Sequence, residues 1–199
     1  MPWIVPTMLA VALFSLFGAA SAQARPTVKL YRPAYWPKSW PTPPGEFLTA
    51  VDAAAKQYKV APADLIAIGK IESGFKPNSS HQARPATWAK IKNRQIGKSG
   101  KTWGQVYTEA DCHAYGIMGL MPFNFVGVPG GLAVGTPLSR GENITLNVAM
   151  AARLLRGFYE QKGDWISAYH AYNPRGGDKY YQMFRAAKAE FESAARGQV

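Results

Sequence analysis

Apolar residues recur at helical spacing in several stretches of the chain. Over residues 46–58 they stand three or four positions apart, which predicts an amphipathic helix. Pro62 suits the first turn of a second helix, which should run to about Gly74. The same periodicity predicts three further helices, over residues 143–162, 164–172 and 178–195. Strand-like alternation is scarce, so the sequence predicts a mainly α fold.

Two segments interrupt this helical pattern. Residues 33–44 contain five prolines, with Trp36 and Trp40 among them, and proline removes a backbone donor and fixes φ. We expect a Pro/Trp-rich lead-in there, either packed on the domain or acting as a stiff linker. Residues 81–114 are polar, basic and contain glycine, and we interpret them as an inserted lobe of short elements.

The first 22 residues have the pattern of a secretory signal peptide. The apolar run over residues 7–20 is shorter than the roughly 20 residues that cross a membrane. Ala20-Ser21-Ala22 follows it, a small-x-small sequence typical of a cleavage site. Residues 1–6 lack the usual Lys or Arg, which leaves an uncleaved membrane anchor as the alternative. Either interpretation predicts an exported protein, periplasmic or associated with the cell wall.

Composition adds constraints on size, partners and covalent links. The 199 residues are 47% hydrophobic, enough for one domain with a packed core. Lys and Arg number 23 against 12 Asp and Glu, a net charge of +11 that implies an anionic partner. Nucleic acid, acidic lipid and the bacterial cell wall all satisfy that requirement. Cys112 is the single cysteine, so an intramolecular disulfide is excluded, and we interpret it as a buried structural residue.

Glu72 is the most informative charged residue. It follows Leu65 and Ile68 on one helical stripe, where an unpaired carboxylate is costly to bury. Desolvation would raise its pKa and keep the proton on at neutral pH, as a general acid requires. The helix should then end at Ser73-Gly74, beside a loop where a cleft could open. The alternative is a partly exposed glutamate at a frayed helix end.

Three sequence segments resemble a known family when they are taken in order. They are Glu72-Ser73-Gly74-Phe75, then Tyr-Gly-Ile-Met-Gly-Leu-Met-Pro over residues 115–122, then Ala171-Tyr172-Asn173. The soluble lytic transglycosylase family has Glu-Ser-Gly-Phe, Gly-Leu-Met-Gln followed by Met-Pro, and Ala-Tyr-Asn. Asn143-Ile144 also matches a family Asn-Ile. The resemblance spans about residues 46–185.

The resemblance implies a lysozyme-like domain, which would occupy residues 46–199 after the signal peptide and a lead-in over residues 23–45. Such enzymes cleave the β-1,4 bond between N-acetylmuramic acid and N-acetylglucosamine without water, and the muramic acid 6-hydroxyl closes a 1,6-anhydro ring. One carboxylate suffices, because the substrate's N-acetyl group assists. The resemblance further implies peptidoglycan glycan strands as partner, no cofactor, a monomer, and candidate service to a secretion, conjugation or phage-entry apparatus.

Carried over by motif, the catalytic residues are Glu72, as the acid/base, and Tyr172, whose hydroxyl faces it. The matched substrate-binding positions are Ser73, Tyr115, Met118, Gly119 and Asn173, of which Met118 should line the cleft near the acid. Gly119 stands where the family has Gln, so one side-chain hydrogen bond is missing. Pro174-Arg175 replaces the usual Ala-Gly after the last motif.

Other interpretations remain open from the sequence. A hydrolase of the same fold would need a second carboxylate, for which Glu109 and Asp111 are the nearest candidates. A non-enzymatic module would bind the wall or nucleic acid, although export disfavours nucleic acid. The histidines and Cys112 lack metal-ligand spacing, so no metal site is predicted. The cations between Lys90 and Lys101 are interpreted as a solvated face or as attraction to the anionic wall.

Overall fold

The structure, a computed structural model, describes residues 33–82, 85–96, 98, 100–107, 109, 113–121, 143–174 and 176–197. The predicted signal peptide, Asp111 and Cys112 lie outside these residues. The helices are α1 Gly45–Tyr58, α2 Pro62–Ser73, α3 Pro85–Ile91, α4 Trp103–Val106, α5 Ile144–Lys162, α6 Trp165–Tyr172 and α7 Gly177–Arg196. The strands are β1 Ser80–Gln82 and β2 His113–Tyr115. The mainly helical fold class is therefore confirmed.

The long helices begin and end where local chemistry favours it. Pro62 occupies the first turn of α2, and Gly74 ends that helix in the left-handed region at φ 60°. The Asn143 side chain accepts the Leu146 N–H at 2.9 Å and starts α5. The Asp164 carboxylate accepts the Ser167 N–H at 2.8 Å and starts α6, and this bond lowers the pKa of Asp164.

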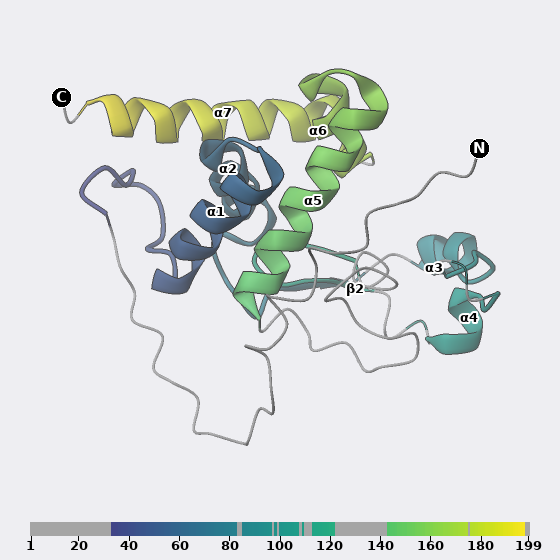
Figure 1. The fold of residues 1–199 in the computed structure, drawn as a ribbon. Helices are drawn as coiled ribbons and strands as arrows, with labels where there is room; N and C mark the ends of the chain where they lie inside the picture. The colour runs from purple at the N-terminus through teal and green to yellow at the C-terminus, as the bar shows by residue number, and fades with distance from the viewer. Residues whose placement is uncertain are drawn as a thin grey trace, which may run out of the picture.

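Helix α2 lies at the centre of the helical body. Helix α1 packs along α5, while α2 packs against α7 and α5 against α6, as Figure 1 shows. Leu65 and Ile68 of α2 are fully buried. Gly69 lies so close to Phe47 of α1 that an added Cβ would come within 2.9 Å of the ring. The helix that carries Glu72 is thus held on several sides.

The described part of the lead-in packs on this core. Trp36 and Trp40 are 3% and 4% exposed, and their rings meet edge to face at 5.7 Å. The Trp36 ring centroid lies 5.0 Å from that of Phe75, just after α2, and 5.8 Å from that of Phe191 on α7. Residues 33–44 therefore join the end of α2 to the end of α7. The lead-in is packed on the domain and is not a free linker.

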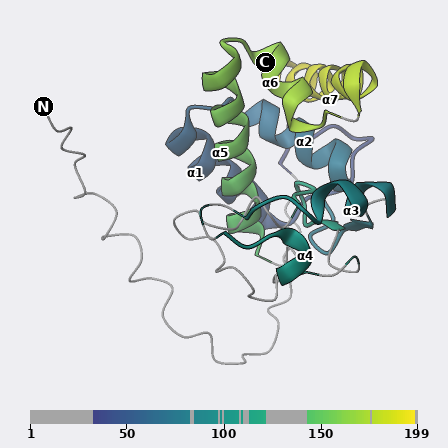
Figure 2. The same ribbon diagram turned by 90° about the vertical axis from the view of Figure 1, so that its right-hand side faces the viewer.

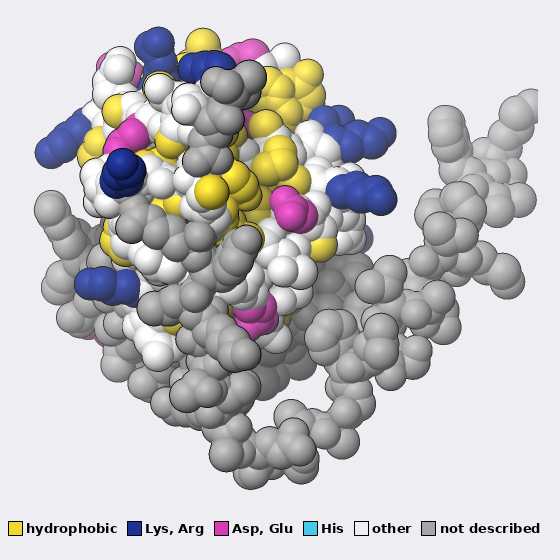
Figure 3. All heavy atoms as spheres, turned by 90° about the vertical axis from the view of Figure 1, so that its left-hand side faces the viewer, with side chains coloured by type: hydrophobic (Ala, Val, Ile, Leu, Met, Phe, Trp, Pro, Cys, Tyr) yellow, Lys and Arg dark blue, Asp and Glu magenta, His cyan; other side chains and the backbone are white. Residues whose placement is uncertain are grey.

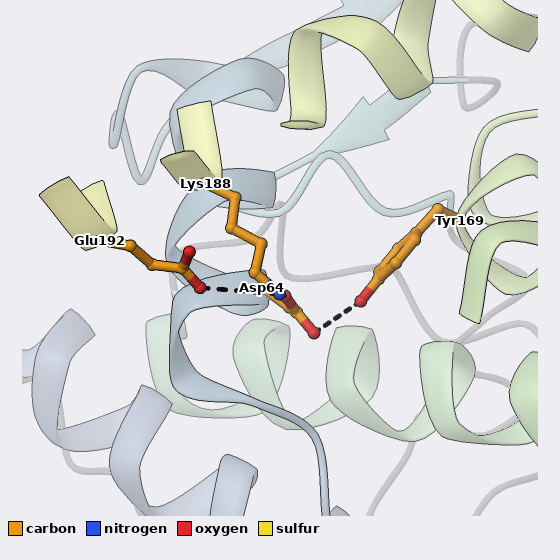
Figure 4. A network of polar contacts seen from close by, with 4 residues as sticks. All are labelled: Asp64, Tyr169, Lys188 and Glu192. Atoms are coloured by element: carbon orange, nitrogen blue, oxygen red, sulfur yellow. Dashed lines mark hydrogen bonds and ion pairs between the residues drawn. The ribbon is translucent and has the colours of Figure 1, made fainter. Parts of the chain in front are cut away.

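A buried polar network holds the start of α2 (Figure 4). Asp64 is 3% exposed, and one of its carboxylate oxygens accepts the Tyr169 hydroxyl at 2.6 Å. The other oxygen lies 2.6 Å from Nζ of Lys188, which also faces Glu192 at 3.8 Å. Burial, followed by the Asp64 charge, raises the pKa of Tyr169 far above its usual range. The network ties α2 to α6 and α7.

A small antiparallel sheet and two short helices form the rest of the described fold. Ser80 of β1 pairs with Tyr115 of β2, and Gln82 pairs with His113. Helices α3 and α4 lie between these strands in sequence and gather at one end of the molecule (Figures 1 and 2). They enclose a second small core of buried residues, Ile96, Trp103 and Tyr107. No helix among the described residues is long and apolar enough to cross a membrane.

We predict that Trp36→Ala lowers the free energy of unfolding by about 3–5 kcal/mol, because it empties a buried aromatic site in the core. Urea unfolding followed by circular dichroism would measure the change. Lys38→Ala is the matched control in the same segment, since Lys38 is exposed, and should change stability by less than about 0.5 kcal/mol. Equal effects of the two substitutions would contradict the structural role of the lead-in.

Candidate active site

Glu72 occupies the last turn of α2 and is half-buried. Gly74 and Phe75 follow it with positive φ angles of 60° and 66°, so the chain turns sharply away from the helix axis. This reversal leaves the Glu72 side chain facing a second turn, which follows β2. The predicted position of the acid at a helix end is therefore realised in the structure.

The facing turn consists of residues 116–119. Tyr115 and Leu120 close it by exchanging backbone hydrogen bonds of 2.8 and 2.9 Å. Gly116 and Gly119 adopt positive φ angles of 78° and 60°, which glycine reaches at little cost. The turn is thus a tight, main-chain-bonded structure, and its backbone forms one wall beside the acid.

Gly119 makes room for the acid. A Cβ placed on Gly119 would collide with Oε2 of Glu72 and would lie 3.0 Å from Cδ and 3.1 Å from Cβ of the same residue. The Glu72 carboxylate therefore packs directly on the Gly119 backbone. In this chain the position has a left-handed φ and no space for a side chain, so it suits glycine where the related motif has Gln.

Ser73 links the end of α2 to the facing turn. Its hydroxyl lies 2.8 Å from the Ile117 carbonyl oxygen and 3.2 Å from that of Gly69, one turn earlier in the helix. The hydroxyl can donate to either carbonyl. Ser73 thereby fixes the distance between the residue that follows the acid and the turn that packs against it.

Tyr172 approaches the same turn from α6. Its hydroxyl donates a 3.0 Å hydrogen bond to the Met118 carbonyl oxygen. Burial raises the pKa of Tyr172 well above its usual range, and the nearby Glu72 charge raises it further. A tyrosine expected to face the acid from the sequence thus lies within its electrostatic reach, bonded to the main chain of the turn.

Asn147 on α5 is a site residue that the sequence analysis missed. Its side chain is 1% exposed; Oδ1 accepts the Met118 N–H at 2.8 Å, and Nδ2 donates to the Tyr115 carbonyl at 3.2 Å. A Cβ on Gly116 would lie 2.7 Å from Cγ of Asn147. Asn147 therefore clamps the turn. The available signal was an amide within the otherwise apolar stripe of Ile144, Val148 and Ala151.

Tyr180 on α7 is the second residue missed. Burial raises the pKa of its hydroxyl far above the usual range, and the next cause is the charge of Glu72. The Tyr180 hydroxyl therefore lies close enough to the Glu72 carboxylate for the two groups to interact. Tyr180 is buried at 7% exposure, whereas its neighbour Tyr181 is half-buried.

Two predicted substrate-binding residues have mainly internal contacts. The Met118 side chain is fully buried in the core, so it does not contribute to the surface of the site. The Asn173 side chain accepts the Gly176 N–H at 3.1 Å and shapes the turn that leads into α7. Both residues position neighbouring parts of the site.

A hollow of about 650 Å³ lies at the opposite end of α2, lined by Asp64, Trp165, Tyr169 and Lys188 among others. None of the site residues predicted from the sequence lines it. No group of three or more His, Cys, Asp or Glu side chains among the described residues is placed to hold a metal ion. The hollow is therefore separate from the site at Glu72.

A family model described as the Transglycosylase SLT domain matches residues 49–193, most of the chain and all of the elements that form this site. The chain belongs to the SLT transglycosylase family. At family level, its function is therefore of the lytic transglycosylase type and acts on peptidoglycan. Neither a curated protein nor a solved structure matches the chain significantly.

We predict that Asn147→Ala lowers the free energy of unfolding by about 1–3 kcal/mol, because it leaves the buried Met118 N–H without an acceptor. Chemical unfolding would measure the loss. Gln161→Ala, an exposed change on the same helix, is the matched control and should be nearly neutral. An Asn147 variant as stable as the control would show that the clamp contributes nothing.

Proposed function

We propose that this SLT domain is a lytic transglycosylase that cuts the β-1,4 bond between N-acetylmuramic acid and N-acetylglucosamine and leaves a 1,6-anhydro end. One observation carries the proposal: the Glu72 carboxylate packs on a fixed backbone turn, and its charge acts on two buried tyrosine hydroxyls, those of Tyr172 and Tyr180. A carboxyl group in such surroundings suits general acid/base work.

In the proposed reaction Glu72 first acts as an acid. It gives its proton to the glycosidic oxygen while the bond from that oxygen to C1 of the muramic acid breaks. Glu72 then acts as a base and takes the proton of the 6-hydroxyl, whose oxygen forms the new bond to C1. The proton returns to the carboxyl group, no water is consumed, and one carboxylate completes the cycle.

The alternative is hydrolysis by the same fold, which needs a second carboxylate to activate water. Glu72 is the carboxylate whose charge acts on both buried hydroxyls. Of the two other candidates, Glu109 is exposed and Asp111 lies outside the described residues. Within the described part of the chain, this arrangement favours the single-carboxylate reaction. We also propose that the protein is exported and works on glycan strands in the periplasm or wall, as its N-terminal sequence pattern indicates.

Glu72→Gln should abolish the release of anhydro-muropeptides, with a loss of at least about 100-fold, because an amide cannot donate and recover the proton. Purified peptidoglycan would be digested and its soluble products analysed by mass spectrometry. Asp52→Asn, an exposed change on α1, is the matched control and should keep full activity.

Products with reducing ends instead of anhydro ends would replace the proposal with hydrolysis. Anhydro products formed undiminished by the Glu72 variant would remove Glu72 from the mechanism. Soluble products from neither protein would favour a wall-binding module.

Tyr180→Phe should move the basic limb of the pH profile for cleavage to higher pH. A hydroxyl beside a carboxylate favours the ionised form, so its removal lets Glu72 keep its proton at higher pH. Initial cleavage rates across pH would measure the shift. Tyr181→Phe removes a neighbouring hydroxyl that is only half-buried and is the matched control. Identical profiles for the two variants would refute the electrostatic contact.

A further inference from the structure

The positive charge of this chain is concentrated in one folded part. Residues 85–107, here named the basic segment, contain five Lys and Arg residues and neither Asp nor Glu. Residues 45–79, which include α1 and α2, contain four residues of each sign. The five cations of the basic segment are all exposed: Lys90, Lys92, Arg94, Lys98 and Lys101. The local excess of positive charge is therefore much larger than that around α1 and α2.

The basic segment is a folded platform rather than a loose charged run. The Lys92 carbonyl accepts the Gly104 N–H at 2.7 Å, and the Arg94 carbonyl accepts the Trp103 N–H at 3.0 Å. A Cβ on Gly104 would come within 3.1 Å of the Lys92 carbonyl oxygen, so this approach depends on glycine. The backbone at Lys92 and Arg94 is thus fixed to the small core around Trp103, while the side chains of these two residues are exposed on the surface.

Four of these cations have no acidic partner within the described part of the chain: Lys90, Lys92, Arg94 and Lys98. The helical body differs, because Arg156 pairs with Glu160 and Lys188 with Asp64. On the side of the molecule away from α3 and α4, side chains of both signs are interspersed (Figure 3). A solvated protein face normally mixes the two signs in this way. The uniform sign of the basic segment indicates an anionic ligand.

The basic segment precedes, along the chain, the strand that leads into the turn beside Glu72. It lies between β1 and β2 in sequence, and β2 ends at Tyr115, where the turn that packs on Glu72 begins. Figure 1 shows α3 and α4 beyond the two-stranded sheet and well apart from α7. A polymer whose backbone is cut at Glu72 could therefore extend its side groups toward this surface.

We propose that the basic segment binds the carboxylates of the peptide stems that hang from the glycan strand. This inference rests on the proposed function, because it assigns the substrate feature that the same enzyme would recognise. The sugar backbone of peptidoglycan offers no carboxylate once the lactyl group is joined to peptide, so the anionic groups of a peptide-bearing strand lie on the stems. Lysine is a flexible point charge, which suits carboxylates at variable spacing.

The test measures binding without cleavage, using the full chain with Glu72→Gln. One variant adds Lys90→Gln, Lys92→Gln, Arg94→Gln and Lys98→Gln, and the matched control adds Lys38→Gln, Lys56→Gln, Lys162→Gln and Arg196→Gln. The control removes the same charge from exposed positions elsewhere. Co-sedimentation would compare peptide-bearing peptidoglycan with glycan strands stripped of stems by an amidase, whose freed lactyl carboxylates are then capped as neutral methylamides. Thermal melting would verify that each variant folds.

We expect the basic-segment variant to bind peptide-bearing peptidoglycan about tenfold more weakly at low salt, and the control less than about twofold more weakly. Stripped strands should bind all three proteins equally. The protein with an intact basic segment should bind peptide-bearing strands more tightly than stripped strands. Because the attraction is between exposed charges, added salt should remove this difference in affinity. This measurement tests the inference even if the variant unfolds.

Equal weakening in the variant and its control would overturn the inference, as would equal loss on stripped strands. Walls freed of phosphate polymers by acid but retaining their stems provide a further arm. If binding disappears on those walls, the ligand is a phosphate polymer and the assignment to stem peptides is wrong. Failure of the wild type to release anhydro products would overturn the proposed function alone, because binding is measured separately.

Discussion

The site depends on one close contact, the packing of the Glu72 carboxylate against the backbone of Gly119. A carboxylate can approach a main chain this closely only where no Cβ intervenes, and only if both elements are held still. The surrounding hydrogen bonds provide that rigidity. Ser73 bonds the Ile117 carbonyl, Tyr172 bonds the Met118 carbonyl, and Asn147 bonds the Met118 N–H. Three different elements thus converge on one short turn.

These bonds go to main-chain atoms, which limits how the site can vary. The hydrogen bonds to the turn do not involve the side chains of Ile117 and Met118, which are instead held by burial in the core. Asn147 is constrained by hydrogen bonding, because its buried amide is both a donor and an acceptor. Gly119 is constrained in the opposite sense, since any side chain would displace the acid. The departure from the related Gln motif is therefore compatible with an intact Glu72.

The helix that carries the acid is anchored at both ends by different means. At its start, Asp64 is held by Tyr169 and Lys188, so a buried charge is compensated. At its end, Phe75 is packed by the two tryptophans of the lead-in. The Pro/Trp-rich segment, far from the acid in sequence, therefore helps to fix the point where the chain leaves α2.

Local sequence signals determined much of this protein. Apolar periodicity, with Pro62 and Gly74 as boundaries of the second helix, located five helices, because helix formation and termination depend on neighbouring residues. The motif around Glu72 also identified the candidate acid. The three-residue strands were too short to show alternation. Asn147 and Tyr180 became visible only in the tertiary structure, because the turn and the acid that they contact lie tens of residues away in the chain.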